Sequence, residues 1–120
     1  MALAHARPLQ PVDIHPLRDA LSHSATHAIL KTPSTELIRV ILRAGGGQPA
    51  HRVAGDMTLL CLEGVVEVRL DGPPCRLEAM QLVLVPGGVE RAIAAVTDAS
   101  LLMTIHVPAG MPGSGSSTNG

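Results

Sequence analysis

The stretch GQPAHRVAGDMTLLCLEG, residues 47–64, decides the fold of this chain. Its second half is an apolar run that ends at Glu63-Gly64, and a second apolar run begins directly after the glycine. Two short apolar runs joined by a tight glycine-containing turn are typical of paired β-strands. We therefore predict strands over Met57–Leu62 and Val65–Leu70.

The same pattern of short apolar runs between turn residues continues on both sides of this pair. The turns contain Pro, Gly, Asp, Ser and Thr, and no segment has the periodicity of a long helix. Eight or nine short strands at this spacing fit an all-β sandwich or a jelly-roll β-barrel. The further strands that we predict are Thr26–Lys31, Glu36–Leu42, Leu82–Val85, Glu90–Val96 and Leu101–Val107.

The two ends of the chain differ from this central pattern. Residues 1–24 contain three prolines and little periodicity, which predicts an extended N-terminal arm with one short helical turn over Pro16–Leu21. Residues 109–120 are mostly Gly, Pro, Ser, Thr and Asn, which bury too little apolar area to offset the entropy of ordering. We therefore assign the β-barrel domain to residues 25–108 and expect a disordered C-terminal tail.

Composition excludes several classes of function. The formal net charge is -1 and no stretch concentrates Lys or Arg, so a nucleic-acid partner is not expected. The chain has no Phe, Tyr or Trp, which excludes base stacking and any chemistry that needs a phenol. No apolar run approaches the length of a membrane span, no signal peptide is apparent, and a cytoplasmic location is expected.

The two quoted regions of sequence, residues 47–64 and Leu84-Val85-Pro86-Gly87-Gly88, resemble the two motifs of the cupins. The resemblance covers about Leu37 to Val107 and implies a cupin-type jelly-roll β-barrel, also called a double-stranded β-helix. The run His51-Arg52-Val53-Ala54-Gly55 is similar to the first motif of small single-domain bacterial cupins. In the family, three His and one Glu hold a divalent metal inside the barrel.

Carried over residue by residue, the resemblance implies a degenerate metal site. His51 matches the first ligand, whereas Val53 falls on the second His position, Met57 on the Glu position and Glu90 on the last His position. Zinc, iron and manganese sites need about three protein ligands. No cofactor is therefore identified, and a divalent metal, if one binds, would be held by His51 and Glu90.

The alternation of side chains along a strand predicts a binding pocket independently of the resemblance. If Met57 faces the barrel interior, then Leu59 and Cys61 face it too, and the preceding segment adds His51 and Val53. Glu90 is expected to approach from the opposite side and to pair with the imidazole. The predicted ligand-binding pocket thus comprises His51, Val53, Met57, Leu59, Cys61 and Glu90.

The remaining Cys and His residues suggest no second site. Cys61 and Cys75 form no Cys-x-x-Cys motif and are interpreted as reduced, packed thiols. His23 and His27 would share a face only on a helix, and a strand is expected there instead. His106 lies in the last predicted strand, where its facing cannot be fixed from sequence.

Three functions remain open on sequence alone. The first is a small-molecule-binding or sensing protein without the usual cupin metal, and the missing ligands favour it. The second is a metal-dependent enzyme of the dioxygenase or isomerase type, using His51, Glu90 and other ligands. The third is assembly through a dimer surface. A homodimer is expected, because the strand Glu36–Leu42 is apolar on both faces.

Overall fold

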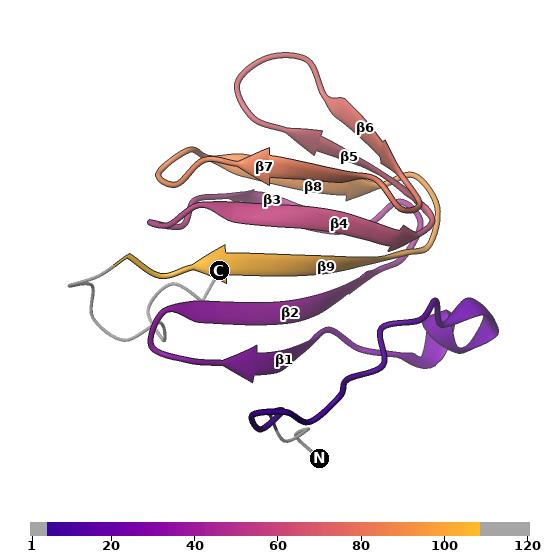
Figure 1. The fold of residues 1–120 in the computed structure, drawn as a ribbon. Coiled ribbons are helices and arrows are strands. Elements are labelled where there is room, and N and C mark those ends of the chain that lie inside the picture. The colour runs from indigo at the N-terminus through magenta and orange to yellow at the C-terminus, as the bar shows by residue number, and fades with distance from the viewer. Residues whose placement is uncertain (1–4, 109–120) are drawn as a thin grey trace.

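The computed structural model describes residues 5–108, which form nine β-strands and one short 3₁₀-helix, η1 (Arg18–His23) (Figure 1). The predicted disordered tail, residues 109–120, lies outside the described residues. No helix among residues 5–108 is long and apolar enough to cross a membrane. The strands are β1 (His27–Lys31), β2 (Thr35–Leu42), β3 (Gly47–His51), β4 (Met57–Glu63), β5 (Val65–Arg69), β6 (Cys75–Glu78), β7 (Leu82–Val85), β8 (Arg91–Ala95) and β9 (Ala99–His106).

The strands form two antiparallel sheets. One has five strands in the order β1-β2-β9-β4-β7, and the other has four in the order β3-β8-β5-β6. The all-β prediction is confirmed. No strand among the described residues is hydrogen-bonded to both sheets, so the predicted barrel is open and its two halves pack as a sandwich.

The hydrophobic cluster between the two sheets consists, within residues 5–108, of aliphatic and sulfur-containing side chains. Along β4, Met57, Leu59 and Cys61 alternate inward and are at most 1% exposed. On β9, Leu101, which is fully buried, is opposite Cys61. Burying one such side chain contributes roughly 1.5–3 kcal/mol to folding.

Three strands differ from the sequence prediction: β6 (Cys75–Glu78) is additional to the predicted strands, and β3 and β9 differ for physical reasons. β3 begins at Gly47, in a stretch where we predict no strand, and its sequence lacks an apolar alternation. It is an edge strand that pairs only with β8, which allows it to contain Pro49. β9 begins at Ala99, two residues before the predicted start at Leu101, because the segment stays paired with β2 as far as Leu42.

The N-terminal arm packs on the outer face of the five-stranded sheet. The Ala6 N–H donates to the Ile29 carbonyl of β1 at 2.8 Å, and Leu21 of η1 is buried. The helical turn occurs at Arg18–His23, two residues later than predicted. The arm covers Arg39, which faces away from the core on β2 and is 4% exposed.

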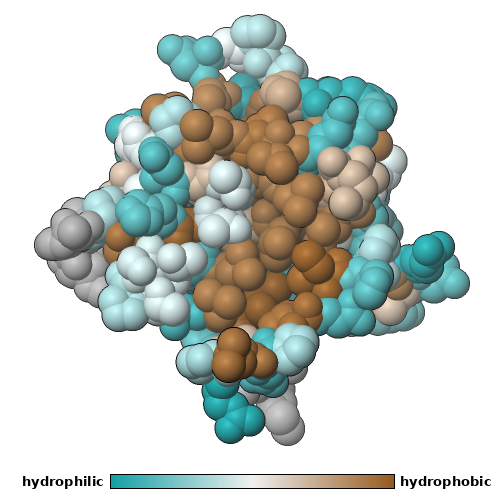
Figure 2. All heavy atoms as spheres, viewed as in Figure 1, coloured by the Kyte–Doolittle hydropathy of each residue, from teal (hydrophilic) through white to brown (hydrophobic). Residues whose placement is uncertain are grey.

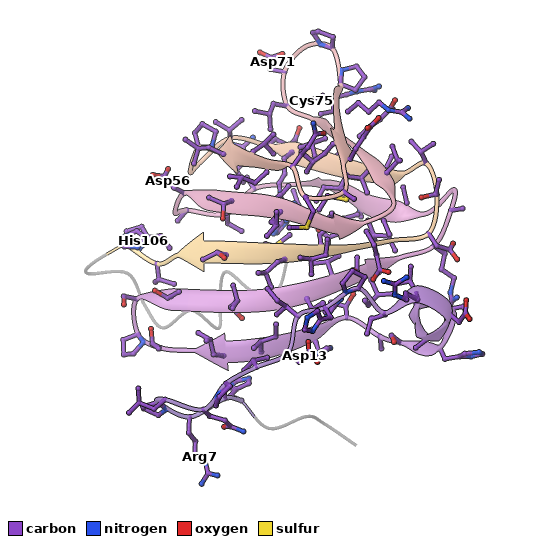
Figure 3. The ribbon with its side chains drawn as sticks, turned by 45° about the vertical axis from the view of Figure 1, so that its right-hand side comes forward. Arg7, Asp13, Asp56, Asp71, Cys75 and His106 are labelled. Carbon is purple, nitrogen blue, oxygen red and sulfur yellow. The ribbon has the colours of Figure 1, made fainter. Side chains whose placement is uncertain are left out.

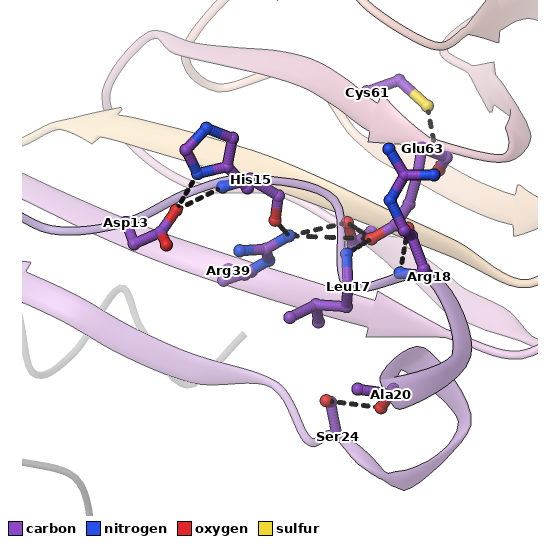
Figure 4. A network of polar contacts seen from close by, with 10 residues as sticks. Asp13, His15, Leu17, Arg18, Ala20, Ser24, Arg39, Cys61 and Glu63 are labelled. Atoms are coloured by element: carbon purple, nitrogen blue, oxygen red, sulfur yellow. Dashed lines mark hydrogen bonds and ion pairs between the residues drawn. The ribbon is translucent and has the colours of Figure 1, made fainter.

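Arg39 and Glu63 anchor the arm through a buried polar network (Figure 4). The Arg39 Nη2 lies 3.6 Å from the Glu63 Oε2 and donates to the His15 carbonyl at 2.7 Å. The Glu63 carboxylate also accepts the Leu17 and Arg18 backbone N–H groups at 2.8 and 3.0 Å. Burial acts to raise the pKa of Glu63, but these hydrogen bonds and Arg39 outweigh it, so the pKa is lowered.

Candidate functional site

Four of the predicted pocket residues lie together in the core. Met57, Leu59 and Cys61 are 1%, 0% and 0% exposed, and Val53 is 6% exposed. All four belong to the cluster of buried side chains between the sheets. These four side chains are therefore close-packed parts of the hydrophobic core. That they also contact a ligand stays a prediction.

One end of the core is framed by two loops, residues 52–56 and 86–90, which we call the rim. The Gly88 N–H donates to the Val53 carbonyl at 2.7 Å, and the Gly87 N–H donates to the Asp56 Oδ1 at 2.8 Å. The His106 N–H donates to the Asp56 carbonyl at 2.9 Å, and Figure 3 shows these two residues side by side at this end.

Two glycines allow the rim to close this tightly. A Cβ atom on Gly55 would lie 1.6 Å from the His106 carbonyl oxygen, and one on Gly87 would lie 2.3 Å from the Ala54 carbonyl oxygen. Any other residue would force the backbones apart. The rim therefore fixes the end of β3 and the beginning of β8 next to the beginning of β4.

His51 and Arg91 face each other at this end of the core. They are paired residues of β3 and β8, so their side chains project from the same face of the sheet. Arg91 precedes Ile93 and Ala95 in the alternation that points into the core, and it is only 4% exposed. His51 is half-buried.

The polar atoms of this pair are poorly satisfied. The His51 Nε2 and the Arg91 Nε and Nη1 are buried and have no hydrogen-bond partner among residues 5–108. The Arg91 Nη2 has one weak contact, 3.4 Å from the Gln48 Oε1. Burial lowers the pKa of the Arg91 guanidinium, although a guanidinium stays protonated in proteins. The site therefore contains an unpaired positive charge.

Glu90 lies outside this group. It is exposed and precedes the first residue of β8, and it makes no hydrogen bond to His51 among the described contacts. The expected His51–Glu90 pair is thus not present in the structure, because the inward position belongs to Arg91. A shift of one residue along a strand exchanges its two faces. The sequence contained a signal for Arg91: if the apolar Ile93 is placed in the core, Arg91, two residues before it on the same strand, faces the core as well.

The other candidates of the sequence analysis lie apart from this site. His23 ends η1 while His27 begins β1, and His106 is exposed at the end of β9. The Cys61 thiol contacts the carbonyl oxygens of Glu63 and Gly64, both at 3.4 Å, and burial raises its pKa. Cys75 is an exposed free thiol, so the prediction that it is packed is wrong.

Two hollows lie under the arm and away from the rim. One, of about 760 Å³, is lined by residues of the arm and β1 and by Arg39. The other, of about 530 Å³, runs between the arm and β4 and is lined by Val12, Ile14, Leu60 and other residues. Both hollows depend on the position of the arm, and the Arg39 Nη2 already donates to the His15 carbonyl and the Ser100 hydroxyl there.

Residues 38–112 match the sequence model of the family described as the cupin domain. This chain belongs to the cupin family. Solved structures agree with the fold: a cupin superfamily protein from Desulfitobacterium hafniense has a TM-score of 0.72 at 17% identity, covering 90% of this chain and 100% of that one. A conserved protein of unknown function from Streptococcus pyogenes has a TM-score of 0.70 at 17% identity, covering 90% and 98%.

A third similar structure, an RmlC-like cupin from Shewanella frigidimarina, has a TM-score of 0.65 at 18% identity and covers 71% of this chain and 77% of that one. No curated protein matches the chain. At these identities the structural matches establish the fold alone.

The residues of this cupin do not fit the divalent metal of its family. The rim end offers one imidazole, from His51, while Val53 and Met57 supply neither nitrogen nor oxygen. The inward residue of β8 is Arg91, whose guanidinium is a cation and has no free electron pair for a metal. Within residues 5–108, no three His, Cys, Asp or Glu side chains come together as a metal site would need.

Proposed function

We propose that this cupin binds a small organic molecule at the rim end of its core, and that it does so without a divalent metal. The observation that carries the proposal is the set of buried, unpartnered polar atoms on His51 and Arg91. Unpaired polar groups in a protein interior cost free energy, and they are typical of sites that a ligand or ordered water completes. The apolar neighbours Val53 and Met57 would contact the body of the ligand.

Native mass spectrometry, combined with elemental analysis of protein purified without added metal, tests this proposal. We expect substoichiometric zinc, iron and manganese, and a small organic molecule released when the protein is denatured. Replacing His51 with Ala and Arg91 with Gln should abolish the co-purified molecule. A divalent metal at full occupancy, lost in the His51→Ala variant, would favour the metal-dependent enzyme instead.

We also propose that the protein acts as a homodimer through the outer face of the five-stranded sheet. Figure 2 shows a broad apolar area on this face. Leu82 and Leu84 of β7 are each 62% exposed and the neighbouring Met80 is 71% exposed. Apolar side chains gathered on one face support contact with a second copy, because water-exposed patches of this kind are unfavourable.

A further inference from the structure

The ligand of the rim site is, we infer, a small carboxylate whose anionic group binds Arg91 and His51. This inference rests on the proposed binding function and specifies its ligand class. Two arginines of the chain, Arg39 and Arg91, are both 4% exposed but differ in their surroundings.

The first arginine, Arg39, has its charge balanced by an ion pair, although its Nε is buried without a hydrogen-bond partner. The Arg39 Nη2 lies 2.7 Å from the His15 carbonyl oxygen, 3.3 Å from the Ser100 Oγ and 3.6 Å from a Glu63 carboxylate oxygen. A carboxylate, a hydroxyl and a carbonyl thus surround the charge. The positive charge of Arg39 is thus compensated by a carboxylate of the same chain.

Arg91 is equally buried and has no such compensation. No Asp or Glu of residues 5–108 comes within ion-pair distance of it, and its one acceptor is the neutral amide of Gln48 at 3.4 Å. Glu36 is buried and faces inward on β2, yet it forms no ion pair with Arg91. Burial raises the pKa of Glu36, which disfavours the charged form that could neutralise a cation.

An uncompensated buried cation is among the most costly features of a protein interior. A bound anion would lower this cost, because it would both neutralise the charge of Arg91 and accept hydrogen bonds from its guanidinium. The Arg91 Nη2 has only the 3.4 Å contact with Gln48, so a carboxylate can accept two parallel hydrogen bonds, one from Nη2 and one from the unpartnered Nε or the unpartnered Nη1. The His51 Nε2 provides a third polar contact on the opposite strand.

The surroundings restrict the remainder of the ligand. Val53 belongs to the rim and Met57 directly follows it; at 6% and 1% exposure, they provide an apolar lining. Leu59 and Cys61 are fully buried behind Met57, so a long tail would have to displace packed core atoms. A short apolar chain that carries one carboxylate therefore suits this site.

Titration of the full-length protein with butyrate tests the inference, with butyramide as the matched neutral probe and sodium chloride holding the ionic strength constant. The readout is the Arg91 Nε–H signal in a ¹H–¹⁵N spectrum. We expect butyrate to shift this signal to saturation. Butyramide and chloride should leave it unchanged.

Two variants complete the test. Arg91→Gln should lose butyrate binding, whereas Arg69→Gln, which removes an exposed arginine at the end of β5, should retain it. Equal shifts with butyrate and butyramide would overturn the carboxylate inference while leaving a small-molecule site intact. If neither probe shifts the wild-type signal, the inference is also wrong, whatever molecule co-purifies with the protein.

Discussion

Arg91 of β8 is the direct cross-strand partner of His51 of β3, and both side chains turn into the end of the core that the rim encloses. In the cupin family this region holds a metal ion. Here a permanent positive charge is supplied by the protein itself, in a setting where Val53 and Met57 provide no ligand atoms. The Arg91 guanidinium would therefore attract a ligand in this region, where the metal ion would do so in other cupins.

Rebuilding the metal ligands tests where the β8 side chains point. Val53→His, Met57→Glu and Arg91→His together should create a four-ligand set with His51, and this variant should bind zinc or manganese stoichiometrically. The matched control keeps Arg91 and carries Glu90→His instead, and it should bind no more metal than the wild type because position 90 is exposed. Stronger metal uptake by the control, measured by calorimetric titration, would mean that β8 is out of phase with our description.

The two cysteines should differ sharply in reactivity. Cys75 is exposed, whereas Cys61 is fully buried and burial raises its pKa, which disfavours the reactive thiolate. An aromatic disulfide reagent near pH 8 should therefore modify one thiol per folded chain and both after unfolding in urea. Cys75→Ser should remove the fast reaction. Fast labelling of Cys61 in that variant would contradict the packing of β4.

Glu63 should make the docking of the arm sensitive to acid. Its pKa is lowered in the folded protein, so its contribution is complete above the unfolded pKa and is lost as the pH falls through the folded pKa. The free energy of unfolding should fall between about pH 6 and about pH 3, and less steeply in Glu63→Gln. At neutral pH that variant should lose roughly 2–5 kcal/mol, since Arg39 is left buried without its partner. Identical pH profiles for the two proteins would exclude this role for Glu63.

Light scattering at micromolar concentration should give twice the mass of one chain. Leu84→Glu places a charge on the proposed interface without entering the core, because Leu84 is 62% exposed. That variant should be monomeric with an unchanged circular dichroism spectrum. A wild-type protein that stays monomeric would rule out the homodimer, and a dimeric Leu84→Glu variant would move the interface elsewhere.

Sequence reasoning succeeded where local pattern and burial agree. The alternation of Met57, Leu59 and Cys61 predicted both a strand and its inward face, and β4 has that form. It failed at β3, whose polar sequence and Pro49 carry no alternation, since an edge strand needs little apolar surface. The comparison of β4 with β3 indicates that a strand can be predicted from sequence when alternate side chains of that strand are buried in the core.

Two polar features could not be predicted in the same way. The network of Arg39 and Glu63 joins residues far apart in the chain and depends on how the arm folds back over the sheet. The site at Arg91 was missed because an error of one residue in the phase of β8 exchanges a buried cation for an exposed carboxylate. Both features involve charge in the interior, which hydrophobic patterns do not reveal.

Arg91 serves a ligand at the expense of stability, and urea unfolding of Arg91→Met tests this role most directly. Replacing an uncompensated buried cation with an apolar side chain of similar size should raise the free energy of unfolding by roughly 1–3 kcal/mol. The matched variant Arg39→Met should instead lose about 3–5 kcal/mol, because it removes the cation that pairs with the partly buried Glu63 carboxylate. Butyrate should stabilise the wild type and leave Arg91→Met unaffected. An Arg91→Met protein less stable than the wild type in the absence of butyrate would show that Arg91 supports the fold, and it would contradict the account.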